Sequence, residues 1–278
     1  MPGQLAVLGW PIAHSLSPRI HRAAYGALGL PWRYSAVRCG EAELAGFLAA
    51  RGPEWLGFSV TMPLKEEAHR IAATLDPIAR VSGVVNTLAR RTDGGWDGFN
   101  TDVPGLAAAI ASAGLDATRT VILGTGATAV SAVLAAQRLG AERVWVAGRN
   151  AAAAQGIAVR LKGHGPVVVC TPADPALERA RATLVISTLP GPAGRELPVP
   201  QGLTAVPLFD VAYDPWPSPL ASRWRAVGGS AFPGTEMLIE QAIVQIRIFS
   251  NGSPEAELPD ERAVRDVMRA AVTPDMGG

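Results

Sequence analysis

The chain has 278 residues, of which 48% are hydrophobic and 18% charged, and its formal net charge is +1. This balance predicts a folded globular protein large enough for two domains and argues against a disordered chain. No basic or acidic block occurs, so a small-molecule partner is favoured over nucleic acid or an anionic membrane surface.

The remaining composition favours a cytoplasmic protein without a metal. Cys39 and Cys170 lie far apart, as expected in a reducing compartment, and the four histidines share no ligand spacing. The N-terminal segment enters an apolar strand without the basic start of a signal peptide. The longest uncharged stretch, residues 120–137, contains polar residues and two glycines, which indicates a strand, turn and helix rather than a membrane span.

The first half of the chain alternates between predicted strands and helices. Strands are expected at residues 5–9, 32–37 and 57–61, and helices from Ser17 onward, at 41–50 and at 66–75. Ser17 and Pro18 resemble an N-cap followed by a first-turn proline. Residues 84–90 and 95–99 predict a hairpin, because Asp93-Gly94 is a two-residue turn signal.

The second half repeats the alternation. A helix at 103–113 precedes strands at 120–123 and 143–147, which flank an alanine-rich helix at 127–139. Further strands are expected at 167–170, 184–187 and 208–211, and the chain is helical from 236 with a break at 254–259. The alternation predicts an α/β protein with mostly parallel sheets.

A glycine motif follows the strand at 120–123. Gly124-Thr125-Gly126-Ala127-Thr128-Ala129 fits G-x-G-x-x-A between a strand and a helix, which predicts that a dinucleotide pyrophosphate binds at the helix N-terminus. The alternative is a tight turn without a ligand. After the next strand stands Arg149 rather than a carboxylate, which favours NADP over NAD unless Arg149 merely begins a helix.

Polar islands interrupt the apolar first half at residues 14–18, 59–65, 85–87 and 100–102, each beside a predicted strand. Ligands of open α/β sheets bind at strand ends. Ser15 and Ser17 on an extended segment would point the same way and could hold a carboxylate, unless Ser17 only caps the helix. Of 25 basic residues only Lys65 and Lys162 are lysine, and Lys65 lies in one of these islands.

Six segments together resemble the shikimate dehydrogenase family, and they occur in the family's order. They are residues 9–18 (GWPIAHSLSP), 60–65 (VTMPLK), 83–88 (GVVNTL), 98–102 (GFNTD), 210–215 (DVAYDP) and 234–242 (GTEMLIEQA). The resemblance implies an NADP-dependent enzyme that reduces 3-dehydroshikimate to shikimate in aromatic amino-acid biosynthesis. It also implies two α/β domains, a substrate domain of residues 1–102 and 237–278 and a Rossmann-like NADP domain of residues 103–236.

The resemblance implies a role for each matched position. Lys65 and Asp102 would form the acid–base pair at the reacting oxygen. Ser15 and Ser17 would bind the substrate carboxylate. The further substrate ligands would be Thr61, Asn86, Tyr213 and Gln241, and the cofactor would be held by Gly124, Gly126, Ala127 and Arg149, with Gly234 and Met237 near the nicotinamide.

The chain departs from the family pattern at two places. Ser59 stands where the family commonly has asparagine, and Gly148-Arg149-Asn150 replaces the usual Asn-Arg-Thr of the cofactor site. Two other functions stay open. One is a sister dehydrogenase acting on quinate or an amino analogue, although the Ser15/Ser17 pair favours shikimate. The other is a non-catalytic sensor on the same fold, which would not need Lys65 and Asp102. A monomer and a homodimer are both compatible with the sequence.

Overall fold

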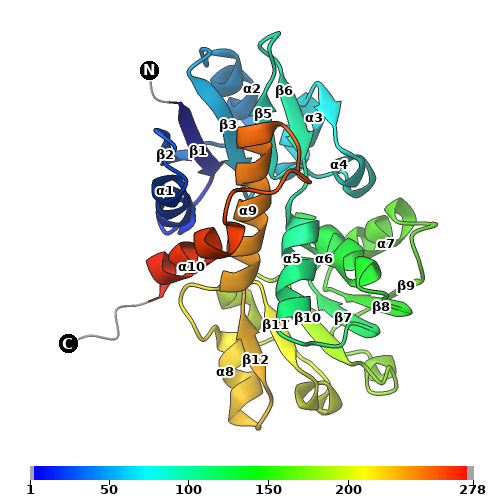
Figure 1. Cartoon of the computed structure of the whole chain (residues 1–278). Coiled ribbons are helices and arrows are strands. Elements are labelled where there is room, and N and C mark those ends of the chain that lie inside the picture. The colour runs from blue at the N-terminus through cyan, green and yellow to red at the C-terminus, as the bar shows by residue number, and fades with distance from the viewer. Residues whose placement is uncertain (1–2, 274–278) are drawn as a thin grey trace. The chain divides into compact units, whose positions relative to one another are not determined.

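The structure, a computed structural model, describes residues 3–273, which divide into two compact units (Figure 1). Unit 1 comprises the chain up to Thr101 together with the part from Leu238 onward, and unit 2 comprises Asp102–Met237. Each unit contains its own six-stranded sheet, so the predicted two-domain α/β class is confirmed. Within residues 3–273, no helix is long and apolar enough to cross a membrane.

The sheet of unit 1 is mixed. Its strands are β1 (Gln4–Gly9), β2 (Arg33–Arg38), β3 (Trp55–Val60), β4 (Thr74–Leu75), β5 (Thr87–Arg90) and β6 (Trp96–Phe99), in the order β2-β1-β3-β5-β6-β4. β1 is parallel to β2 and β3, whereas β5 runs antiparallel to both β3 and β6. The predicted hairpin is therefore present, and Gly94 in its turn has a φ of 90°, which suits glycine.

Alternation along β1 explains how both faces of this sheet are covered. Leu5 and Val7 point to one face, where they pack with α1 (Ser17–Ala27), α9 (Thr235–Asn251) and α10 (Glu261–Val272). Ala6 and Leu8 point to the other face, where they pack with residues of α2 (Glu41–Ala49) and α3 (Lys65–Ile71). Since all four side chains are nearly inaccessible, β1 is buried on both sides.

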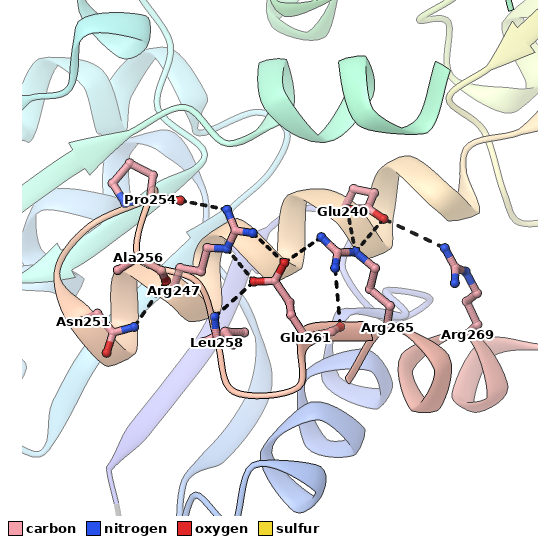
Figure 2. Close-up of polar contacts among 9 residues, drawn as sticks. All are labelled: Glu240, Arg247, Asn251, Pro254, Ala256, Leu258, Glu261, Arg265 and Arg269. Atoms are coloured by element: carbon pink, nitrogen blue, oxygen red, sulfur yellow. Dashed lines mark hydrogen bonds and ion pairs between the residues drawn. The ribbon is translucent and has the colours of Figure 1, made fainter. Parts of the chain in front are cut away.

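An ion-pair cluster joins α10 to α9 (Figure 2). Arg247 Nε donates to Glu261 Oε2 over 2.7 Å, and Arg265 Nε donates to Glu240 Oε1 over 3.0 Å. Arg265 Nη2 also lies 2.8 Å from Glu261 Oε1, so the cluster is continuous. Burial alone would raise the pKa of Glu261, but hydrogen bonds from Arg247 and from the Leu258 N–H hold it below its usual value. The charged form of Glu261 thus fastens α10 to α9.

Unit 2 contains an all-parallel sheet with the strand order of a Rossmann fold. Its strands are β7 (Arg119–Leu123), β8 (Arg143–Ala147), β9 (Val167–Cys170), β10 (Leu184–Ser187), β11 (Leu208–Asp210) and β12 (Ala231–Pro233). Counted within the unit, the order β9-β8-β7-β10-β11-β12 is 3-2-1-4-5-6, which reverses direction at β7. The helices are α5 (Asp102–Ser112), α6 (Ala127–Arg138), α7 (Ala151–Arg160) and α8 (Pro219–Ala226), and short 3₁₀ turns span Pro175–Leu177, Gly191–Gly194 and Gln201–Ala205.

The structure differs from the sequence-based prediction between residues 66 and 82. The expected helix over 66–75 ends at Ile71, and the chain continues as β4 and then as α4 (Pro77–Ser82). Asp76 caps α4 by accepting hydrogen bonds from the backbone N–H groups of Ile78 and Ala79, and Pro77 occupies the first helical position. The Asp-Pro start signal of a new helix thus outweighs the helical pattern that precedes it.

Candidate active site

Strand direction brings four predicted site segments of unit 1 to one edge of its sheet. The carboxyl ends of the parallel strands β1 and β3 are adjacent, as the 2.9 Å hydrogen bond from Trp10 N to Met62 O shows. Because β5 is antiparallel to β3, it begins at this edge with Thr87 opposite Ser59, and β6 ends there with Phe99 opposite Thr87. The segments that contain Ser15, Lys65, Asn86 and Thr101 therefore all follow or precede strands at the same edge.

Ser15 and Ser17 lie on the loop between β1 and α1. Leu16 has helical backbone angles, so the prediction of an extended segment with both hydroxyls on one side is wrong. The alternative role of Ser17 as the N-cap is also wrong, because α1 begins with Ser17 itself and the cap residue is Leu16. Instead Ser15 Oγ accepts a hydrogen bond from the backbone N–H of Ser17 over 3.3 Å, so the two residues are linked.

Lys65 is the first residue of α3 and is half-buried. Its carbonyl oxygen accepts a 2.9 Å hydrogen bond from the backbone N–H of Val85, which places it beside the segment that contains Asn86. Thr61 is tied to the end of β1 by a 2.9 Å bond from its N–H to the Leu8 carbonyl, and its own carbonyl accepts from Leu64 N–H over 2.9 Å. The lysine segment is thus held by the backbone at both of its ends.

Asn86 is 3% exposed and stands at the centre of a polar cluster. Its Oδ1 accepts from the backbone N–H of Thr101 over 2.8 Å, and its Nδ2 donates to Thr101 Oγ1 over 2.9 Å. Nδ2 also lies 3.5 Å from Oε1 of Gln241 on α9. Within unit 1 the structure therefore brings two predicted substrate ligands, Asn86 and Gln241, into contact.

Some members of this cluster were not predicted from the sequence. Gln245, one helical turn after Gln241, donates from Nε2 to Thr87 Oγ1 over 3.0 Å, and Thr101 lies next to the predicted Asp102. The available signal was the four-residue spacing of the two glutamines, which puts both on one face of α9.

The glycine loop of unit 2 has the geometry of a dinucleotide cradle. Gly124 has a φ of 127°, and a Cβ there would meet Thr188 Oγ1, so only glycine fits. Gly126 precedes α6, which begins at Ala127, and nothing lies within 4 Å of where a Cβ of Gly126 would stand. A phosphate can therefore approach the backbone at the N-terminus of α6, as the pyrophosphate of a dinucleotide requires.

Arg149 is exposed beside this loop. β7 and β8 pair with Leu123 opposite Ala147, so Gly124 and Gly148 follow neighbouring strand ends. Asn150 caps α7 through a 3.0 Å hydrogen bond from Ala153 N–H, and a Cβ at Gly148 would meet Cγ2 of Thr125. Both departures from Asn-Arg-Thr thus have local structural reasons, and a guanidinium without a competing carboxylate at this strand end suits a 2′-phosphate.

The remaining predicted residues also belong to unit 2. Tyr213 is half-buried after β11, and Gly234 follows the neighbouring β12, where its N–H donates to the Ala212 carbonyl over 3.1 Å. Met237 lies in the first turn of α9 and is 7% exposed, and Asp102 begins α5 with 5% exposure. The predicted site residues are therefore divided between the two units.

Three comparisons find known proteins that this chain resembles. The family model of the shikimate dehydrogenase substrate-binding domain matches residues 7–88. The shikimate dehydrogenase (NADP(+)) of Rubrobacter xylanophilus is 36% identical over 260 residues, which cover 90% of this chain and 92% of that protein.

Solved structures give the same result. The crystal structure of Mycobacterium tuberculosis shikimate dehydrogenase superimposes with a TM-score of 0.84 at 36% identity, covering 97% of this chain and 98% of that one. Shikimate 5-dehydrogenase from Thermus thermophilus, in complex with NADP(H) and shikimate, has a TM-score of 0.78 at 29% identity and covers 97% of this chain and all of its own. Full-length similarity at this level, together with the six ordered motifs, shows that the chain belongs to the shikimate dehydrogenase family.

Proposed function

We propose that this protein catalyses the reversible, NADP-dependent reduction of 3-dehydroshikimate to shikimate. The observation that supports this most directly is the meeting of four segments at one sheet edge of unit 1, with Lys65 held beside the Asn86 cluster. The relatives named shikimate dehydrogenase (NADP(+)) and the Thermus thermophilus complex support both the substrate and the cofactor. A cytoplasmic location and a monomeric or dimeric state belong to the same proposal.

The site residues of unit 1 suit a small polyhydroxylated acid. Ser15 and Ser17 would hold the carboxylate of the substrate, and Thr61, Asn86 and Gln241 would bind its carboxylate or ring hydroxyls, with Tyr213 of unit 2. Amide and hydroxyl groups are both donors and acceptors, so they can bind hydroxyl groups in fixed directions. The buried position of Asn86 makes such a hydrogen bond stronger than it would be in water.

Lys65 and Asp102 would handle the proton. NADPH, when bound at the glycine loop and Arg149, supplies the hydride that reduces the ring ketone. Negative charge then develops on the ketone oxygen, where the Lys65 ammonium would stabilise it and donate a proton to give the hydroxyl. Asp102 would accept a hydrogen bond from the lysine ammonium and hold it in place, and the lysine would regain the donated proton from solvent. The reverse reaction follows the same steps backwards.

The chain provides a matched control for testing this role. Lys162 is the second lysine and is exposed after α7, so Lys65→Ala and Lys162→Ala make the same chemical change at two sites. Shikimate and NADP mixed with the wild type should raise nicotinamide absorbance, Lys162→Ala should match it, and Lys65→Ala should be inactive while still binding NADP. Near-normal turnover by Lys65→Ala would refute the assignment, and faster turnover of quinate would favour the sister activity.

A further inference from the structure

A chain of buried hydrogen bonds runs behind Asn86. Tyr34 Oη lies 2.5 Å from Ser59 Oγ, and Ser59 Oγ lies 2.7 Å from Oε1 of Gln245. Gln245 Nε2 then donates to Thr87 Oγ1 over 3.0 Å, and Thr87 Oγ1 donates to Asn86 Oδ1 over 2.9 Å. None of these five residues is more than 5% exposed, so water does not compete for their polar atoms.

Two backbone groups determine the direction of every bond in this relay of Tyr34, Ser59, Gln245, Thr87 and Asn86. The carbonyl of Asn86 can only accept, and it lies 3.4 Å from the side chain of Gln245, which must therefore present Nε2 on that side. Gln245 Oε1 then faces Ser59 and can only accept, so the Ser59 hydroxyl donates to it and accepts from Tyr34.

The second backbone anchor is at the other end. The N–H of Thr101 can only donate, and it meets Asn86 Oδ1 over 2.8 Å. Oδ1 also accepts from Thr87, so both bonds require the amide oxygen of Asn86 on this side and leave Nδ2 facing Thr101 Oγ1 and Gln241. If the Asn86 amide were reversed, its NH₂ group would face the N–H of Thr101 and the hydroxyl of Thr87, two donors, inside a buried cluster.

The relay also reaches the segment of the predicted carboxylate ligands. The ring of Tyr34 stacks on that of His21, with centroids 3.9 Å apart, and His21 Nδ1 donates to the carbonyl of Ser17 over 3.0 Å. Ser59 is short enough to lie within hydrogen-bond distance of both Tyr34 and Gln245. The asparagine that is common at this position in the family would need room between those two partners.

We propose that Ser59 is a positioning residue: its hydroxyl holds the side chain of Gln245 in place, and through Gln245 and Thr87 it supports the amide of Asn86 in the direction that the Thr101 N–H sets, with Nδ2 available to a hydroxyl oxygen of the substrate. This inference rests on the proposed function, because it assigns the direction of one substrate contact. Ser59 itself does not touch the substrate in this arrangement. Its contribution is to substrate binding, and binding of NADP does not depend on it.

Substitutions at Ser59 can separate the hydroxyl from the volume of the side chain. Ser59→Thr and Ser59→Val have the same shape and differ only in the hydroxyl, and Ser59→Ala removes it without adding volume. We expect Ser59→Ala and Ser59→Val to raise the shikimate Kd by calorimetry, and the KM, about tenfold, with kcat and the NADP Kd within about twofold of wild type. Ser59→Thr should lie close to the wild type, and thermal unfolding identifies any variant that fails to fold.

A double-mutant cycle with Asn86→Ala tests whether Ser59 acts through Asn86. If it does, Ser59→Ala should have no further effect on the shikimate Kd once the Asn86 amide is absent. Three outcomes would overturn the role of the relay alone, provided the wild type binds shikimate. The first is additive losses of shikimate affinity in the double mutant, and the second is equal losses in Ser59→Thr and Ser59→Val. The third is an unchanged shikimate Kd in Ser59→Ala. Absence of shikimate binding by the wild type would overturn the proposed function and the relay's role together.

Discussion

His21 should make unit 1 less stable as the pH falls. Its side chain is fully buried, and burial lowers its pKa to about 4, although the Ser17 carbonyl and the side chain of Gln245 both favour the charged form. The rings packed against it belong to Tyr25 and Tyr34, whose own pKa values are raised by burial, so both stay neutral. Protonation of His21 would place a charge among neutral rings.

The sign and size of the effect follow from linkage. In the unfolded chain a histidine titrates near 6.5, so between that value and about 4 the unfolded state binds more protons than the folded state. The contribution of neutral His21 is therefore fully present above pH 6.5 and decreases as the pH falls towards 4. Between pH 7 and pH 5 the free energy of unfolding should decrease by about 2 kcal/mol through His21 alone.

The variant His21→Phe removes the titration and keeps an aromatic ring against Tyr34. We expect the wild type to lose about 2 kcal/mol more than this variant between pH 7 and pH 5, measured by urea unfolding at both pH values. His164→Phe makes the same change at an exposed position and should behave as the wild type. NMR titration of the four histidines measures the pKa of His21 directly, because the chemical shift of its resonance should not change above pH 5. A His21 resonance that titrates near 6.5, or equal losses in wild type and His21→Phe, would refute the reasoning.

Three further predictions concern the cofactor loop and the packing of α10. Gly124→Ala should weaken NADPH binding at least about tenfold, because its φ of 127° and Thr188 oppose a Cβ; unchanged affinity in fluorescence titration would contradict the cradle. Arg149→Ser should raise the Kd of NADPH about tenfold or more and leave that of NADH unchanged, and parallel changes for both would exclude a 2′-phosphate contact. Glu261→Gln should lower the free energy of unfolding by about 1–3 kcal/mol near neutral pH, because Arg247 and Arg265 lose their charged partner. Since the pKa of Glu261 is lowered in the fold, this difference should shrink as the pH falls through that pKa, and a constant difference would argue against ion pairing.

Local sequence signals predicted most of the fold. The strands at 143–147, 167–170 and 184–187 have the predicted bounds, because short apolar runs between turn residues define buried parallel strands well. β4 and β12 were not predicted, since two or three residues are too few to show an alternation. The helix predicted over 66–75 was too long, because its apolar residues continue to Leu75, whereas α3 ends at Ile71 and Thr74–Leu75 form β4 before Asp76 and Pro77 begin α4.

The placement of the site segments could be predicted from the sequence, whereas the hydrogen bonds between them could not. That the segments of Ser15, Lys65 and Asn86 lie beside strands is a local property, and pairing of β1, β3 and β5 then brings them to one edge. The relay behind Asn86 depends on Gln245, which is 158 residues from Thr87 along the chain, and no local pattern connects them. At Ser17 a local signal was present but misleading. A serine before a proline predicts an N-cap, yet it is Ser15 whose hydroxyl accepts a hydrogen bond, from the backbone N–H of Ser17.

The two differences from the family pattern can be related to side chains that lie beside them. Gly148 replaces an asparagine, and Thr125 occupies the space where its Cβ would lie, so the two positions have to be considered together. Ser59 likewise replaces an asparagine, and its hydroxyl meets Tyr34 and Gln245. In both cases the residue is shorter than asparagine, and a nearby side chain contacts it or occupies the space beside it. If Arg149 binds the cofactor and Asn86 binds the substrate as proposed, both should contribute more to binding here than in relatives that keep both asparagines.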